Sequence, residues 1–171
     1  MRVVAGAFKG RRLSVPPGAR PTADRVREAL FSILGEVAGA RVLDLYAGSG
    51  ALGIEALSRG ADFATFVDRD RRAVQAIARN VEALGATAEI RREDALRFLA
   101  RVDEAFDLVF VDPPYHCAGR LALPLAERLP PRLAPDARIV TESDKRLPLE
   151  LPLPLLVERV YGDTRIAVHG G

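Results

Sequence analysis

After Leu34, short apolar runs alternate along the chain with longer amphipathic stretches. This alternation is typical of βαβ units, in which a helix follows each strand of a parallel sheet. The expected strands are 41–46, 63–67, 87–91, 108–111 and 138–141. The expected helices are 52–59, 70–84 and 119–129. The pattern therefore predicts an α/β fold built on a mostly parallel sheet.

The last part of the chain departs from this alternation. Segments 155–161 and 165–169 flank Gly162-Asp163, a pair typical of the turn between antiparallel strands. We expect this hairpin to complete a seven-stranded mixed sheet. Leucines and prolines alternate in 147–156, which is either a connection covering the sheet or an exposed contact surface, and we favour the connection.

The first part of the chain is predicted to be a small basic extension, residues 1–34. Segments 2–8 and 11–15 are compatible with a hairpin that turns at Lys9-Gly10. Residues 23–34 carry an apolar stripe at helical spacing, with Thr22 placed to cap the helix. We expect the extension to pack on residues 35–171 and to form effectively a single domain with them.

Composition narrows the class of protein. With 171 residues, 49% of them hydrophobic, the chain can bury one sizeable core. One cysteine excludes a disulfide within the chain, and two histidines far apart disfavour a structural zinc site. No apolar run reaches the length of a membrane span. We therefore expect a cytoplasmic protein that has no association with membranes.

The positive charge of the chain is concentrated near the N-terminus. The net charge is only +2, but the first thirty residues hold seven Lys and Arg side chains against two acidic ones. Such a segment favours contacts with nucleic-acid phosphates, which supply salt-sensitive affinity without sequence information. A solvated basic face is the alternative interpretation.

A glycine loop follows the first predicted strand. Residues 48–53 match G-x-G-x-x-G between a strand and a helix, the context in which this motif binds a nucleotide cofactor. Asp44 lies inside the end of that strand, and Asp68 ends the next one, where a carboxylate can hold ribose hydroxyls. Dinucleotides and S-adenosylmethionine both carry such a ribose. A purely structural turn, with Asp68 as a helix cap, is the alternative.

Two further strand ends carry acidic groups. Asp94 follows the third strand, where it is placed either to accept a hydrogen bond from an adenine amino group or to cap a helix. Asp112-Pro113-Pro114-Tyr115 follows the apolar run 108–111. Its carboxylate and the Pro113 carbonyl can accept hydrogen bonds from one NH2 group, while the tyrosine offers a stacking face. This tetrapeptide favours chemistry on a nucleobase amino group, with His116 and Cys117 as incidental neighbours.

At this point the sequence resembles a known family. The segment 112–115 together with 44–50 is similar to the amino-group methyltransferases that use S-adenosylmethionine and have the Rossmann-like class I fold. Segments 2–6, 9–13 and 20–28 resemble the RsmD-type guanine-N2 methyltransferases of 16S ribosomal RNA. The resemblance runs nearly from end to end of the chain.

The resemblance implies three sets of site residues. The cofactor set is Asp44, Tyr46, Ala47, Gly48, Ser49, Gly50, Asp68, Arg69, Asp94 and Ala95. The catalytic set is Asp112, Pro113, Pro114 and Tyr115. The RNA-binding set is Arg2, Lys9, Arg11, Arg12, Arg20, Thr22 and Arg25. We expect no metal, a monomer, and a partly assembled small ribosomal subunit as the partner.

Other functions remain open on the residues alone. Adenine-N6 methyltransferases of DNA or RNA share the tetrapeptide, so only the N-terminal resemblance favours guanine. A cofactor- or RNA-binding module without catalysis is disfavoured by the intact Asp112. A nicotinamide oxidoreductase is a third alternative, because the glycine loop also fits that cofactor.

Overall fold

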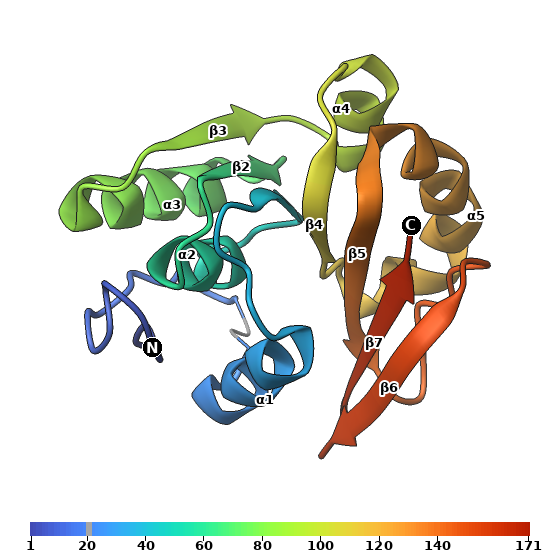
Figure 1. The fold of residues 1–171 in the computed structure, drawn as a ribbon, viewed down its shortest axis with the longest axis horizontal. Helices are drawn as coiled ribbons and strands as arrows, with labels where there is room; N and C mark the ends of the chain where they lie inside the picture. The colour runs from blue at the N-terminus through green and yellow to red at the C-terminus, as the bar shows by residue number, and fades with distance from the viewer. Residues whose placement is uncertain (20–21) are drawn as a thin grey trace.

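The computed structural model describes residues 1–19 and 22–171, and seven strands of this part form a single sheet (Figure 1). The strands are β1 Arg41–Leu45, β2 Phe63–Asp68, β3 Ala88–Arg92, β4 Phe106–Val111, β5 Leu133–Asp144, β6 Leu155–Tyr161 and β7 Thr164–Gly170. Their order is β3-β2-β1-β4-β5-β7-β6. Strands β1 to β5 run parallel, and β7 lies antiparallel between β5 and β6. The predicted α/β fold with an antiparallel C-terminal hairpin is confirmed.

Helices cover both faces of the sheet. They are α1 Asp24–Leu34, α2 Ala51–Ser58, α3 Arg71–Leu84, α4 Ala95–Arg101 and α5 Ala118–Arg128, with short 3-10 turns η1 Tyr115–Cys117 and η2 Pro130–Arg132. Helices α1, α2 and α3 lie on one side, and α4 and α5 on the other (Figure 1). Successive residues of β1 point to opposite faces of the sheet. Val42 packs in the core beside α1 and α2, and Leu43 packs in the core beside α4 and α5.

The helix predicted at 70–84 shows how the sequence encodes an element. Asp70 caps α3 by accepting a hydrogen bond from the backbone N–H of Arg72 at 2.7 Å. Gly85 ends the helix in the left-handed conformation, with φ at 63°. Both signals lie at the ends of the helix itself, so the predicted bounds agree with the observed bounds to within one residue.

Strand β5 is longer than the predicted 138–141. It begins at Leu133 and includes Pro135 and Asp136, two residues that disfavour strands. The structure accommodates them with a shift of register on β4 between Phe106 and Leu108, and with a left-handed backbone at Asp136, φ 60°. This irregularity depends on the neighbouring strand and is invisible in the pattern of β5 alone.

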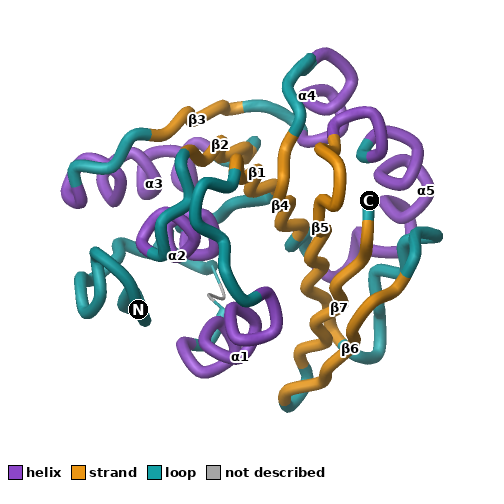
Figure 2. Tube along the Cα trace, viewed as in Figure 1, coloured by secondary structure: helices purple, strands orange, loops and turns teal. Residues whose placement is uncertain are grey.

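The predicted N-terminal hairpin forms only a single antiparallel bridge, between Arg2 and Arg12. Residues 5–10 are turns, because the backbone N–H groups of Val4 and Ala5 donate to the Glu55 carboxylate on α2 at 2.8 and 2.9 Å. Gly6 lies so close to α2 that an added Cβ would stand 1.7 Å from the Ser58 carbonyl oxygen. In the part of the chain that the structure describes, pairing of the two arms is thus limited to this bridge and to backbone bonds between Val3 and Arg11, Gly10 and Val3, and Leu13 and Met1. Figure 2 shows the described residues before α1 as loop.

The predicted cap of α1 is wrong. The helix begins at Asp24 after Ala23, which makes no side-chain capping bond. The hydroxyl of Thr22 donates instead to Glu142 Oε2 at 2.7 Å, in a buried bond that spans 120 positions. A buried carboxyl group on the neighbouring strand therefore takes the hydroxyl that local capping would use. Pro21, expected at the start of this helix, lies outside the described residues.

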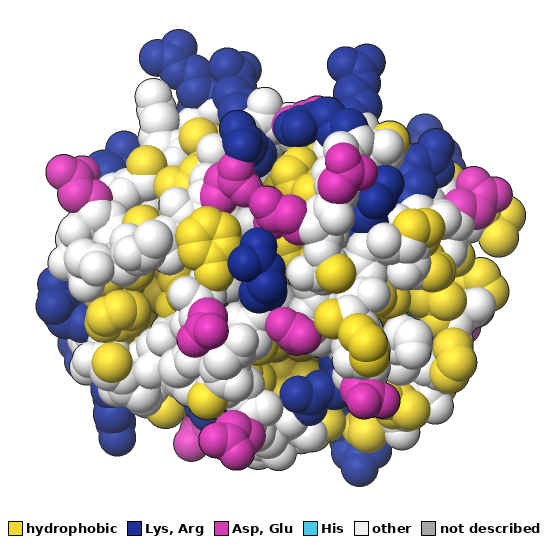
Figure 3. Space-filling model, turned by 45° about the horizontal axis from the view of Figure 1, so that its top comes forward, with side chains coloured by type: hydrophobic (Ala, Val, Ile, Leu, Met, Phe, Trp, Pro, Cys, Tyr) yellow, Lys and Arg dark blue, Asp and Glu magenta, His cyan; other side chains and the backbone are white. Residues whose placement is uncertain are grey.

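Arg27 corrects the interpretation of the basic segment. Arg27 is one of the seven cations counted in this segment, but its side chain is fully buried. It pairs with Asp24 at 2.9 Å and Glu55 at 3.9 Å, and it donates to the carbonyl oxygens of Thr22, at 3.2 Å, and of Arg2. This cation therefore joins the extension to α2. Figure 3 shows exposed Lys and Arg side chains scattered over one face, both at its edges and near its middle, with Asp and Glu side chains among them.

The segment 147–156 combines both expected roles. Leu149 and Leu151 are buried in the core beside α4 and α5, while Leu147, Leu155 and Leu156 are exposed. In the described part of the chain, no helix is both long enough and apolar enough to span a membrane.

Candidate active site

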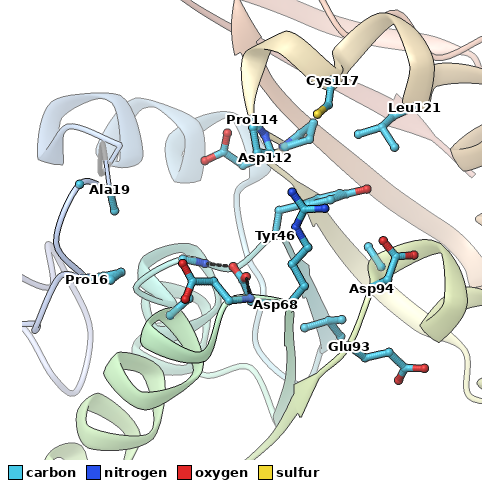
Figure 4. Close-up of a pocket in the computed structure, with 18 of the residues that line it drawn as sticks. Pro16, Ala19, Tyr46, Asp68, Glu93, Asp94, Asp112, Pro114, Cys117 and Leu121 are labelled. Atoms are coloured by element: carbon cyan, nitrogen blue, oxygen red, sulfur yellow. Dashed lines mark hydrogen bonds between the residues drawn. The ribbon is translucent and has the colours of Figure 1, made fainter.

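A cavity of about 590 Å³ opens at the carboxyl ends of β1 to β4. The sheet order reverses at β1, since β2 lies on one side of it and β4 on the other, and ligands bind at such switch points. Figure 4 shows Asp112 and Pro114 at one end of the cavity, Asp68 and Asp94 farther along it, and Tyr46 between them. Four loops that follow strands thus converge on one space.

The cavity gathers most of the predicted cofactor and catalytic residues. Those that line it are Tyr46, Gly48, Asp68, Arg69, Asp94, Ala95, Asp112, Pro113, Pro114 and Tyr115. Those that do not are Asp44, Ala47, Ser49 and Gly50, which lie within or beneath the glycine loop. The RNA-binding candidates Arg2, Lys9, Arg11, Arg12, Thr22 and Arg25 also lie outside it, and Arg20 lies outside the described residues.

The glycine loop departs from ordinary backbone geometry. Gly48 and Gly50 have φ values of 59° and 76°, and Tyr46 shares this left-handed conformation at 59°, which is uncommon for a bulky residue. Such strain is concentrated at ligand sites. Gly53 serves packing, because an added Cβ would lie 2.4 Å from the Phe66 ring on β2. The loop and the helix after it therefore need glycine for two different reasons.

Asp68 is held at the cavity by backbone donors. Its Oδ2 accepts from the N–H of Gly48 at 2.9 Å and its Oδ1 from the N–H of Asp70 at 2.8 Å. Asp70 is the cap of α3, so the alternative interpretation of Asp68 as that cap is wrong. A carboxylate oxygen has two lone pairs, and Asp68 thus retains capacity to accept from a ligand hydroxyl.

Asp94 caps a helix and also lines the cavity. Its Oδ1 caps α4 by accepting from the backbone N–H groups of Leu96 and Arg97, each at 3.1 Å. The same residue lines the cavity, followed by Ala95 at the first position of the helix. These two hydrogen bonds hold the Asp94 carboxylate in the wall of the cavity.

The tetrapeptide begins where β4 ends at Val111. Pro113 is buried and Pro114 exposed, and η1 starts at Tyr115 with the N–H of Cys117 donating to the Pro114 carbonyl at 2.8 Å. This turn leaves Asp112 and Tyr115 half-buried at the cavity. The structure therefore presents a carboxyl group and an aromatic ring together.

Three carboxyl groups converge at neighbouring strand ends, from Asp44, Asp112 and Glu142. Burial raises the pKa of Asp112 well above its ordinary value, and the charges of Glu142 and Asp44 raise it further. Burial also raises the pKa of Asp44 to about 8, against the hydrogen bond from the Gly53 N–H at 2.9 Å. A ligand that carries positive charge would favour the ionised forms of these carboxyl groups and so lower their pKa values again.

Two parts of the site are missing from the sequence-based sets. Pro16 to Ala19 form one wall as a turn in which the Ala19 N–H donates to the Pro16 carbonyl at 3.1 Å. The Pro-Pro-Gly sequence predicts a turn, but it does not predict that this turn borders the cavity. Glu142 follows Thr141 at the end of the fifth predicted strand, so the strand-end rule that selected Asp68, Asp94 and Asp112 also points to it.

The chain is similar to proteins that are named as ribosomal RNA methyltransferases. The ribosomal RNA small subunit methyltransferase D of Haemophilus influenzae is 37% identical over 174 residues, which cover 95% of this chain and 89% of that protein. The protein of the same name from Escherichia coli K12 is 47% identical over 119 residues. That match covers 67% of this chain and 60% of its relative.

A solved structure shares the fold. It is the Thermus thermophilus 16S rRNA N2 G1207 methyltransferase RsmC in complex with AdoMet and guanosine, with a TM-score of 0.74 and 25% identity. The likeness covers 90% of this chain and 44% of RsmC. A family model described as Conserved hypothetical protein 95 matches residues 1–169 of the chain. The chain therefore belongs to this family, together with the proteins named ribosomal RNA small subunit methyltransferase D.

Proposed function

We propose that this protein methylates the exocyclic N2 of a guanine in 16S ribosomal RNA, with S-adenosylmethionine as the methyl donor. Family membership supports methylation of small-subunit rRNA that depends on S-adenosylmethionine. The observation that carries the proposal is the single cavity that joins Asp68 and Asp94 to the Asp112–Tyr115 turn. One space thus holds residues suited to a nucleoside cofactor and residues suited to a base.

The residues of the cavity fit the cofactor. Asp68, held by two backbone donors, is placed to accept the ribose hydroxyls, and Asp94 with Ala95 borders the space for the adenine. The glycine loop leaves room for the methionine part. When bound, S-adenosylmethionine supplies an electrophilic methyl group on a positively charged sulfur, and this charge would favour the ionised forms of the nearby carboxyl groups.

The Asp112–Tyr115 turn would orient the acceptor. Asp112 and the Pro113 carbonyl accept the two hydrogens of the base amino group, which draws its lone pair out of conjugation with the ring and toward the methyl group. Tyr115 stacks on an unpaired or extruded base. As the nitrogen–carbon bond forms, the carbon–sulfur bond breaks, its electron pair stays on sulfur, and the nitrogen loses a proton to Asp112 or to water.

The choice of guanine over adenine as the methylated base rests on similarity to other proteins. RsmC, which shares the fold, is named as an N2 methyltransferase, and the tetrapeptide alone suits adenine N6 equally. Exposed basic residues of the extension, among them Arg2, Lys9, Arg12 and Arg25, would contact rRNA phosphates. Thr22 is buried with its hydroxyl engaged, which is at odds with direct contact to RNA.

The substrate assignment can be tested on ribosomal particles. Small subunits from a strain lacking the gene are incubated with the protein and radiolabelled S-adenosylmethionine, and the rRNA is digested to nucleosides. We expect label in N2-methylguanosine, with partly assembled subunits as better acceptors than naked 16S rRNA. Label confined to N6-methyladenosine would support the adenine alternative and overturn the guanine assignment.

A further inference from the structure

We propose that Glu142 is a positioning residue for the methyl transfer, acting on Asp112 from the adjacent strand and holding the N-terminal segment against the catalytic turn. This inference deepens the proposed function and rests on it, since it concerns the reaction that Asp112 serves. Glu142 itself does not line the cavity. Its effect therefore passes through the residues that do.

The sheet places the two acidic residues side by side. Strands β4 and β5 run parallel with Val111 opposite Thr141, and Asp112 and Glu142 are the residues that directly follow this last pair, close enough for their charges to interact. Residues that face each other in neighbouring strands project from the same side of the sheet. Glu142 is only 5% exposed, whereas Asp112 is half-buried and reaches the cavity. Glu142 thus lies deeper in the protein than Asp112, away from the cavity.

A second contact ties Glu142 to the start of the chain. The Thr22 hydroxyl donates to Glu142 Oε2 at 2.7 Å, and the Thr22 carbonyl accepts from the Arg27 guanidinium at 3.2 Å. Pro16 to Ala19, shortly before Thr22, form a wall of the cavity. One buried carboxyl group therefore links the catalytic turn with the segment that borders the cavity.

The charges around Glu142 are unbalanced. Asp112 and Asp44 are carboxyl groups, and the cation that acts on Glu142 is Arg27, which is shared with Asp24 and Glu55. On β7, Arg165 lies opposite Ser143, on the other side of the sheet from Glu142, and pairs with Glu158. The cation nearest in effect to Glu142 is therefore shared among several carboxyl groups.

The consequence for Asp112 follows from this crowding. A charged carboxylate beside Asp112 makes it hold its proton more tightly, and burial acts in the same direction on the pKa of both residues. A protonated Asp112 still offers an acceptor oxygen to the base amino group, but only the ionised form can also take the released proton. It accepts that proton more readily if it is more basic. Glu142 thereby sets the pH range in which Asp112 works.

The first test is the pH profile of methyl transfer. Single-turnover rates at saturating cofactor and rRNA particles are compared between wild type, Glu142→Gln and the exposed control Glu150→Gln. Glutamine still accepts from Thr22 but carries no charge, so we expect the acid limb of the profile to move to lower pH by about one unit or more. The control keeps the wild-type profile. An unshifted Glu142→Gln profile would overturn the proposal, even if its melting temperature falls.

The second test needs no methyl acceptor and therefore separates this inference from the substrate assignment. The Glu142 carboxyl carbon is titrated by ¹³C NMR in wild type, Asp112→Asn and the exposed control Asp103→Asn. We expect the Glu142 titration to move to lower pH in Asp112→Asn alone. Thr22→Val should move it to higher pH, because a hydrogen bond to the charged form is lost, and Thr22→Ser should not. A Glu142 titration that is indifferent to Asp112 would overturn the proposal.

Discussion

Asp112 is the residue on which the proposed chemistry depends most directly. It ends β4 at the cavity, beside an exposed proline and an aromatic ring. Local sequence predicts its place, because an apolar run followed by two prolines marks a buried strand and its end. The sequence pattern does not predict its electrostatic surroundings. Asp44 and Glu142 reach it from two other strands, through contacts that span many positions.

Replacing Asp112 by Asn should separate catalysis from cofactor binding. The amide loses one acceptor of the base amino group and the acceptor of its proton, so we expect kcat to fall about 100-fold or more. The Kd of S-adenosylmethionine, measured by calorimetry, should change little because Asp68 and Asp94 remain. Asp103→Asn, at a fully exposed side chain, serves as the control. Turnover at the wild-type rate would refute the catalytic assignment.

Asp44 should make stability fall as the pH rises. Its pKa is raised to about 8 in the folded protein and is close to 3.8 when unfolded, so the folded state binds the proton more tightly. This preference stabilises the fold below the unfolded value and is lost as pH rises toward 8. Asp44→Asn can keep the bond to the Gly53 N–H without a charge. Its melting temperature relative to wild type should therefore increase from pH 5 to 9, and parallel curves would contradict this.

At the scale of elements, the sequence predicts the helices, strands and turns whose signals lie within the element itself. The strands, the helix α3 and the glycine loop follow from periodicity, caps and turn residues. The cap of α1 fails because Glu142 takes the Thr22 hydroxyl. The N-terminal hairpin is limited to one bridge and a few backbone bonds, while Val4 and Ala5 donate to Glu55. The wall formed by residues 16–19 was likewise beyond prediction, since nothing in a Pro-Gly turn says which surface it faces.

The packing of α2 on the sheet can be tested with a pair of glycines. Gly53→Ala places a methyl group 2.4 Å from the Phe66 ring, so we expect a loss of about 1–3 kcal/mol in the free energy of unfolding. Gly119 lies in α5 with no atom within 4 Å of an added Cβ. Gly119→Ala should therefore be neutral or stabilising by up to about 1 kcal/mol. Equal effects in denaturant titrations would argue against close packing at Gly53.

Docking of the N-terminal segment can be tested in the same way. An alanine at Gly6 would clash with the Ser58 carbonyl of α2, while Gly10, with a similar φ of 80°, has open space around it. Both substitutions carry backbone strain of about 1 kcal/mol. Only Gly6→Ala should also release the segment, seen as faster amide exchange at Val4 and Ala5. Equal exchange in the two variants would show that the contact with α2 does not hold the segment.

At the scale of the whole molecule, basic charge is less concentrated than the sequence suggests. Arg27 is buried, and the exposed cations on the face seen in Figure 3 are scattered among acidic side chains. The extension contributes Val3, Leu13 and Leu30 to the core that the sheet and α2 share. We therefore expect RNA to contact a surface made jointly by the extension and the sheet domain.

The salt dependence of RNA binding measures this surface. Lys9→Ala and Arg12→Ala remove exposed cations, and each should lower the slope of log K against log salt by about one if the residue contacts a phosphate. Arg159→Ala on the edge strand β6 provides the matched control. Filter binding with rRNA fragments at several salt concentrations gives the slopes. Unchanged slopes for both variants would place the RNA elsewhere.

The bond between Thr22 and Glu142 also bears on how the protein is made. Synthesis proceeds from the N-terminus, and these residues are 120 positions apart. At about 5–20 residues per second, Thr22 is synthesised roughly 6–24 s before its partner exists. During that interval the wall at Pro16 to Ala19 lacks one of its anchors, although the glycine loop is already complete. A nascent chain thus acquires its glycine loop before the Asp112–Tyr115 turn and before Glu142.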